Sequence, residues 1–194
     1  VRVRRLHPFH LPPADGIRLQ RWLATRAVST GSLRRRLRLV AGADCSPSAD
    51  GHLHAVVVVC EAPAWKVVDE ASASALPLMP YVSGLLSFRE APLLLEALKK
   101  LRTRPDVLLV DGHGRLHPRR LGLASHLSLH LDVPTIGVGK SLLVANLALA
   151  LAAGKDRAGF RIPAARRVLV CQFELPTPQF VGRLASMRLS VGSA

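Results

Sequence analysis

The sequence predicts an α/β domain built on a mixed β-sheet that is flanked by helices. Of the 194 residues, 49% are hydrophobic and 21% are charged, which is the balance of a globular protein with a full core. Three strand-like segments follow one another in residues 36–74, and helix-like and strand-like segments alternate in residues 87–139. Because strands that return through helical crossovers run parallel, this order favours a mixed sheet.

The first part of the chain, residues 1–36, is predicted to be an N-terminal helical arm. Its helix is expected in residues 15–28, where apolar residues recur at roughly helical spacing. These apolar positions are Ile17, Leu19, Trp22, Leu23 and Val28. The next three segments are apolar or β-branched and are separated by turn residues, which predicts three consecutive antiparallel strands. The three segments are residues 36–46, 54–61 and 65–74.

The rest of the predicted sheet alternates helices with strands. Residues 87–104 carry leucines at helical spacing, with Ser87 as the expected N-cap and Glu90 in the first turn. Residues 105–114 form a short apolar run that ends in an acid and glycines, which is typical of a strand buried on both faces. The remaining predicted elements are a helix over residues 119–131 and a strand over residues 133–139.

The charge of the chain predicts a polyanionic partner. A formal net charge of +14 and a pI near 11.4 make nucleic acid the first expectation. Most of the basic residues are arginines, so a skewed genome composition is an open alternative. The longest apolar run is well under the ~20 residues of a membrane span, and the three cysteines form no C-x-x-C pair. We therefore expect a soluble, cytoplasmic protein with no membrane partner.

Two predicted strands end in an acid, Asp44 and Asp111. If these strands are neighbours, the two carboxylates lie a few ångströms apart at one edge of the sheet, where their repulsion requires a cation or a raised pKa. Mg²⁺ is the expected cation, because it is a hard ion that prefers oxygen ligands. Glu90 is a candidate third acid. Each acid taken alone is more simply a turn or capping residue.

The segment "DGHGRLHPRR", residues 111–120, gathers an acid, two glycines, two histidines and three arginines. This composition favours a loop that closes on a phosphate, and a plain surface turn is the alternative. His113 and His117 are possible ligands for a transition metal, but no zinc-binding motif accompanies them, so magnesium is preferred.

The sequence also contains a segment that partly matches a P-loop, the phosphate-binding motif of nucleotide-binding proteins. Residues 134–141, "PTIGVGKS", end like a P-loop, but Pro134 stands where the motif needs its first glycine. Proline has a fixed φ and no N–H to donate, so a nucleotide-binding P-loop is not expected here.

Three segments together resemble the endonuclease V family over roughly residues 37–144, in the same order and at matching spacing. They are "AGADCS", "PYVSGLLSFRE" and "PDVLLVDGHGRLHPRRLGLASHLSLHLDVPTIGVGKSLL". The resemblance implies an RNase H-like fold and a Mg²⁺-dependent nuclease in which Mn²⁺ substitutes for Mg²⁺. It further implies recognition of deoxyinosine, the product of adenine deamination, in DNA, with cleavage of the second phosphodiester bond 3′ to the lesion.

The resemblance also implies roles for individual residues. Asp44, Glu90 and Asp111 would hold the catalytic metal, and Lys140 would be a catalytic cation beside it. Tyr81 would be a wedge that fills the gap left by a displaced base, and some family members have proline at the position of Ser83. The implied substrate-binding residues are Tyr81, Gly84, Gly112, His117, Arg119 and Gly122.

The resemblance is not followed beyond about residue 144. A later S-x-G-H-x-[IL] segment of the family, whose histidine lies near the metal, has no counterpart. We therefore divide the chain into an arm (1–36), an endonuclease V-like core (37–144) and a diverged or truncated C-terminal part of the same domain (145–194). Two alternatives remain open: a catalytically weak or inactive nucleic-acid-binding protein on the same fold, and an inosine-specific endoribonuclease. No obligate protein partner is expected.

Overall fold

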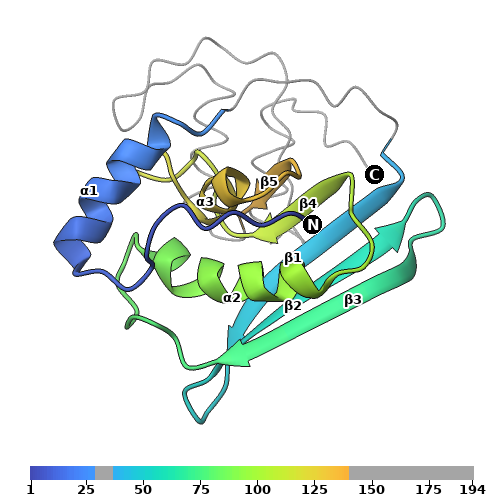
Figure 1. The fold of residues 1–194 in the computed structure, drawn as a ribbon, viewed down its shortest axis with the longest axis horizontal. Coiled ribbons are helices and arrows are strands. Elements are labelled where there is room, and N and C mark those ends of the chain that lie inside the picture. The colour runs from blue at the N-terminus through green and yellow to red at the C-terminus, as the bar shows by residue number, and fades with distance from the viewer. Residues whose placement is uncertain (29–36, 140–194) are drawn as a thin grey trace, which may run out of the picture. The chain divides into compact units, whose positions relative to one another are not determined.

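The computed structural model describes residues 1–28 and 37–139, and the contacts divide the chain into two units, Val1–Gly137 and Val138–Ala194. The first unit carries a sheet whose strands are ordered β3-β2-β1-β4-β5 (Figure 1). The described elements are α1 (Pro13–Ala24), β1 (Leu39–Pro47), β2 (Leu53–Glu61), β3 (Lys66–Ala75), α2 (Leu86–Lys100), β4 (Val107–Asp111), α3 (Leu123–His130) and β5 (Thr135–Val138).

The sheet is mixed, which confirms the predicted fold class. β1 pairs antiparallel with β2, and β2 pairs antiparallel with β3. β4 returns through α2 and lies parallel to β1. The two strands that the sequence predicts to end in an acid, β1 with Asp44 and β4 with Asp111, are therefore neighbours in the sheet.

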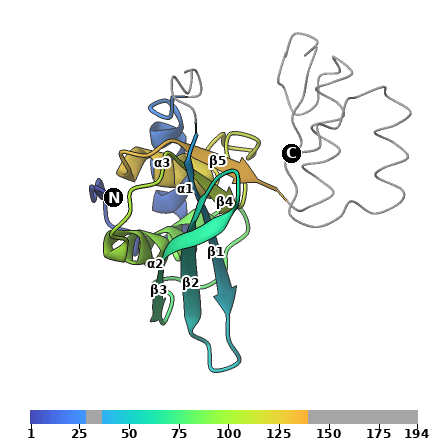
Figure 2. The ribbon, with the colours of Figure 1, turned by 90° about the vertical axis from the view of Figure 1, so that its right-hand side faces the viewer.

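Helix α2 packs against β1, β2 and β3, and it also contacts α3 (Figures 1 and 2). The strand side of this interface shows the alternation of a half-buried strand, because every second residue of β2 is buried. These residues are Leu53, Ala55, Val57 and Val59. They join the leucines of α2 and Phe88 in one hydrophobic core. The core fixes the position of α2, and therefore of Glu90, relative to β1.

The N-terminal segment is tied to this core. Phe9 is buried within it, and the N–H of Arg4 donates to the carbonyl of His130 over 2.7 Å. In α1 the buried positions are Gly16, Gln20 and Leu23. Trp22, which was expected on the apolar face, is 53% exposed. The expected stripe was wrong at this position because Gln20, a polar residue, occupies the buried face.

The N-cap of helix α2 lies two residues earlier than predicted, and the helix lacks the expected side-chain cap. The N-cap is Leu85, and no side chain caps the helix. The Ser87 hydroxyl instead contacts Nδ1 of His126 at 2.9 Å, inside the core. Glu90 therefore lies just after the first turn rather than in it. None of the described helices has the length and apolar character to cross a membrane.

Candidate active site

The two strand-end acids lie beside one another in the sheet. The parallel pairing of β1 with β4 ends at Ala43 and Val110, and Asp44 and Asp111 are the next residues of the two strands. Asp44 is exposed, and Asp111 is half-buried at the carboxyl end of β4. The carboxyl ends of parallel strands are where sites of α/β proteins form, so this edge is the natural place for a ligand.

Glu90 shares the electrostatic environment of these two acids. The pKa of Glu90 is raised to about 7, first by burial and then by the negative charges of Asp44 and Asp111. The pKa of Cys45 also indicates that these acids are close together, because it is raised by burial and then by the charges of Glu90 and Asp44. Three carboxylates from β1, α2 and β4 thus lie in one electrostatic environment, and a cation bound among them would relieve their mutual repulsion.

The chemistry of this donor set fits a hard divalent cation. All three side chains offer carboxylate oxygen, which Mg²⁺ and Mn²⁺ prefer, whereas zinc sites in proteins are built mostly from cysteine and histidine. The raised pKa of Glu90 also shows that, without a cation, the third negative charge is costly at this place. The residues therefore fit the metal that the sequence predicts.

The loop after β4 is packed closely against the start of α3. The N–H groups of Gly122 and Ala124 donate to the carbonyls of Gly114 and His113, over 2.9 and 3.0 Å. A Cβ on Gly122 would lie 2.2 Å from the carbonyl oxygen of His113, so only glycine allows this approach. In the described residues Gly122 thus packs loop against helix, whereas the sequence predicts that it faces a substrate.

His117 is buried in this loop and neutral. Its Nδ1 accepts a hydrogen bond from the N–H of Arg119 at 3.1 Å. The pKa of His117 is lowered to about 4, first by burial and then by the neighbouring Arg119 and His113. A neutral imidazole in this position orders the loop without adding to its positive charge.

The segment before α2 presents Tyr81 to solvent. Met79 and Leu85, on either side, are only 5% and 1% exposed, whereas Tyr81 is 69% exposed. Gly84 has a φ of +78°, which favours glycine, and its carbonyl accepts a hydrogen bond from Nη2 of Arg119 at 2.7 Å. The two ends of the segment are thus fixed while the aromatic ring projects.

Gln20 is a site residue that sequence reasoning missed. Its side chain is fully buried, its Nε2 donates to the carbonyls of Gly84 and Leu121, and its Oε1 accepts from Nε of Arg119 at 2.5 Å. It therefore joins α1, the Tyr81 segment and the loop after β4. The helical spacing could have predicted its burial, because Gln20 is four residues after Gly16 and three before Leu23 and so lies on the same face of α1.

Comparison with known proteins identifies the family. The family model for endonuclease V matches residues 21–168, which is most of the chain. The chain belongs to the endonuclease V family. The endonuclease V of Gloeobacter violaceus is 49% identical over 144 residues, covering 72% of this chain and 57% of that protein. The endonuclease V of Alkalilimnicola ehrlichii is 48% identical over 145 residues, covering 74% and 64%.

Solved endonuclease V structures share the fold, which is RNase H-like as the sequence predicts. The Bacillus subtilis enzyme superposes with a TM-score of 0.66 at 35% identity, covering 73% of this chain and 62% of that one. The catalytic domain of human endonuclease V gives 0.62 at 40% identity, covering 68% and 61%. Ciona intestinalis endonuclease V, solved with a 24mer DNA containing an inosine followed by a ribo-adenosine, gives 0.58 at 33% identity, covering 66% and 57%.

The family match is longer than the resemblance over residues 37–144, since it begins at residue 21 and ends at residue 168. The match covers 57% and 64% of the length of the two curated endonuclease V proteins named above. Lys140 and the C-terminal part, 145–194, lie outside the described residues, so their predicted roles stay predictions.

Proposed function

We propose that this chain is a Mg²⁺-dependent endonuclease that recognises deoxyinosine in DNA and cleaves the second phosphodiester bond 3′ to it. The observation that carries the proposal is the convergence of three acids from separate elements. Asp44 and Asp111 directly follow the last paired residues of β1 and β4, and both raise the pKa of Glu90. Membership of the endonuclease V family supports the same chemistry.

Asp44, Glu90 and Asp111 would hold the metal. Bound there, Mg²⁺ would polarise the scissile phosphate and lower the pKa of an attacking water. Because the pKa of Glu90 is about 7 without a cation, this carboxyl is partly protonated at neutral pH, and a bound cation would favour its ionised form. Lys140, by the resemblance, would add a positive charge to the phosphate.

Lesion recognition would fall to the Tyr81 segment and the loop after β4. Tyr81 is exposed on a segment with fixed ends, which suits a ring that enters the gap left by a displaced base. Displacement costs a few kcal/mol and least at a mispaired base, so inosine is favoured over adenine. Arg119 and Gln20 hold the carbonyl of Gly84, and we assign them the positioning of Tyr81. Gly112 and His117 shape the adjoining loop.

An inosine-specific endoribonuclease is the second candidate. The observation that favours it is the Ciona intestinalis endonuclease V structure, in which the inosine of the DNA is followed by a ribo-adenosine. A 2′-OH beside the lesion is the group that distinguishes the two substrates.

Product mapping on four matched oligonucleotides tests the proposal. Each strand carries one inosine or one adenosine, in DNA or RNA form, and is incubated with Mg²⁺, with Mn²⁺ or with a chelator. We expect one product, cut at the second bond 3′ to inosine, with either metal and none with chelator. Cleavage confined to RNA would replace the DNA-repair proposal by the second candidate. Metal-independent cleavage, or equal cleavage of the adenosine strands, would refute both.

A further inference from the structure

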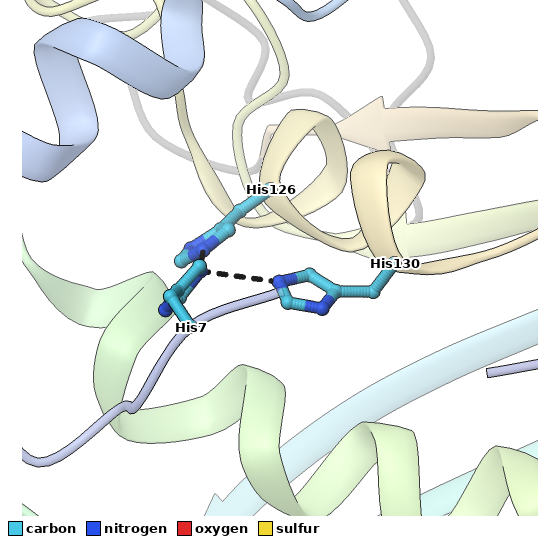
Figure 3. A group of neighbouring side chains, drawn as sticks. All are labelled: His7, His126 and His130. Carbon is cyan, nitrogen blue, oxygen red and sulfur yellow. Dashed lines mark hydrogen bonds between the residues drawn. The ribbon is translucent and has the colours of Figure 1, made fainter. Parts of the chain in front are cut away.

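Three histidines from two segments distant in sequence converge on one another in the described part of the chain (Figure 3). His126 and His130 lie one turn apart on α3 and are fully buried. His7 comes from the N-terminal segment and is half-buried. One ring nitrogen from each of the three lies within 4.8 Å of the other two.

The nitrogens that face one another are the Nε2 atoms. Nε2 of His7 lies 2.8 Å from Nε2 of His126 and 3.2 Å from Nε2 of His130. In a tetrahedral site with metal–nitrogen bonds of 2.0–2.1 Å, two ligand nitrogens are about 3.3 Å apart. The separation of 3.2 Å is close to this value, and the separation of 2.8 Å becomes so with a small outward movement of one ring.

The opposite nitrogen of each ring is already held. Nδ1 of His7 bonds the carbonyl of Pro8 at 2.9 Å, and Nδ1 of His130 bonds the carbonyl of Arg4 at 2.7 Å. Nδ1 of His126 bonds the hydroxyl of Ser87. A carbonyl only accepts hydrogen bonds, so Nδ1 of His7 and of His130 must carry the proton.

This arrangement leaves an electrostatic conflict in the neutral cluster. Burial lowers the pKa of all three histidines, so the rings are uncharged near neutral pH. With Nδ1 protonated, Nε2 of His7 and Nε2 of His130 both present lone pairs, 3.2 Å apart, and neither can donate to the other. A metal cation among the Nε2 atoms would remove the conflict, and neutral imidazoles held through Nδ1 are the form that binds metals.

We propose that His7, His126 and His130 form a zinc-binding site that is separate from the carboxylate site. The three Nε2 atoms supply nitrogen ligands and leave a fourth, open position. Pro8, Arg4 and Ser87 orient the rings through Nδ1, as carbonyls and hydroxyls do around zinc-bound histidines. The ion would cross-link the N-terminal segment to α3, and so reinforce the hydrogen bond of Arg4 to His130.

Spectroscopy with Co²⁺, a stand-in for Zn²⁺, distinguishes this site from the acids. The whole chain is titrated with Co²⁺ in excess Mg²⁺, which occupies the oxygen ligands. A four-coordinate nitrogen site gives intense visible absorption, whereas a six-coordinate oxygen site absorbs weakly. We expect the intense bands in the wild type, and we expect Zn²⁺ to displace them.

Variants locate the ion. His7→Gln should lose the bands and weaken Zn²⁺ binding at least tenfold, and Ser87→Ala should weaken it about tenfold. His54→Gln, on the exposed side of β2, and Glu90→Gln should keep both. Bands that persist in His7→Gln, or that vanish in Glu90→Gln, would overturn the proposal.

X-ray absorption of the zinc-loaded wild type gives a check that needs no variant. Three imidazole nitrogens at about 2.0 Å are expected. Fewer than three, or a shell of oxygen alone, would refute the site even if a histidine variant failed to fold.

Discussion

At the scale of single residues, the pKa of Glu90 reports the charges of the neighbouring acids. Its pKa of about 7 has burial as the first cause and the charges of Asp44 and Asp111 as the next two. Asp44→Asn removes one of these charges, so we expect the pKa of Glu90 to fall in the metal-free protein. Titration of the carboxyl carbon by NMR measures the change. An unchanged pKa would show that the two side chains are farther apart than the described site requires.

Tyr81 can be removed without touching the core, because 69% of it is exposed. We expect Tyr81→Ala to leave the free energy of unfolding nearly unchanged and to weaken cleavage of inosine DNA tenfold or more, since loss of an aromatic contact to a base costs about 1–3 kcal/mol. Thermal unfolding and single-turnover kinetics measure the two effects. The matched control is Trp22→Ala, which removes an exposed aromatic ring from a different element, α1. This variant should leave cleavage intact.

At the scale of elements, two glycines with similar backbones separate conformational strain from crowding. Gly51 has a φ of +85° with open space around it, whereas a Cβ on Gly84 would lie 2.3 Å from Nη2 of Arg119. Gly51→Ala should cost about 1 kcal/mol, and Gly84→Ala about 2 kcal/mol or more, together with a loss of cleavage as the Tyr81 segment shifts. Denaturant unfolding of both variants measures the difference. Equal costs would contradict the contact between Gly84 and Arg119.

The strands and the pair of strand-end acids could be predicted because their signals are local. β-branched alternation marks β2, and an apolar run that ends in acid marks β4. The helical crossover predicted a parallel strand in a mixed sheet, whereas the sequence left the pairing of β1 with β4 as a condition. The structure meets this condition and so brings Asp44 and Asp111 together.

Side-chain partners distant in sequence could not be predicted in this way. Ser87 has the local pattern of an N-cap, but a buried histidine 39 residues later takes its hydroxyl. Gln20 bonds groups 64 and 101 residues away, and no local pattern encodes such partners. The histidine cluster is equally non-local, because His7 is 119 residues from His126.

At the scale of the whole molecule, a net charge of +14 predicts binding to nucleic acid that depends strongly on salt. Between about 50 and 200 mM salt we expect at least a tenfold loss of affinity for DNA, with or without inosine. Fluorescence anisotropy over a salt series measures this slope. A flat slope would favour the alternative that the arginine content reflects genome composition.

The buried His117 predicts a pH dependence of stability. Its pKa is about 4 in the folded chain and about 6.5 when unfolded, so the unfolded state binds the extra proton between these values. The stabilisation is therefore complete above about pH 6.5 and is lost as the pH falls towards 4. His117→Gln should flatten the stability curve in that window by up to about 1.4 kcal/mol per pH unit. Chemical unfolding of both proteins from pH 4 to 7 measures the slopes.

The central claim is that Asp44, Glu90 and Asp111 act together on an inosine-containing strand. The most direct measurement is the single-turnover nicking rate of inosine DNA in Mg²⁺ for the wild type, Asp44→Asn, Asp111→Asn and Glu96→Gln. Glu96 lies on α2 like Glu90 but is exposed and paired with Lys99, so it is the control. We expect a loss of about 10²-fold or more in the two aspartate variants and none in Glu96→Gln. Nicking at the wild-type rate in either aspartate variant would contradict the claim.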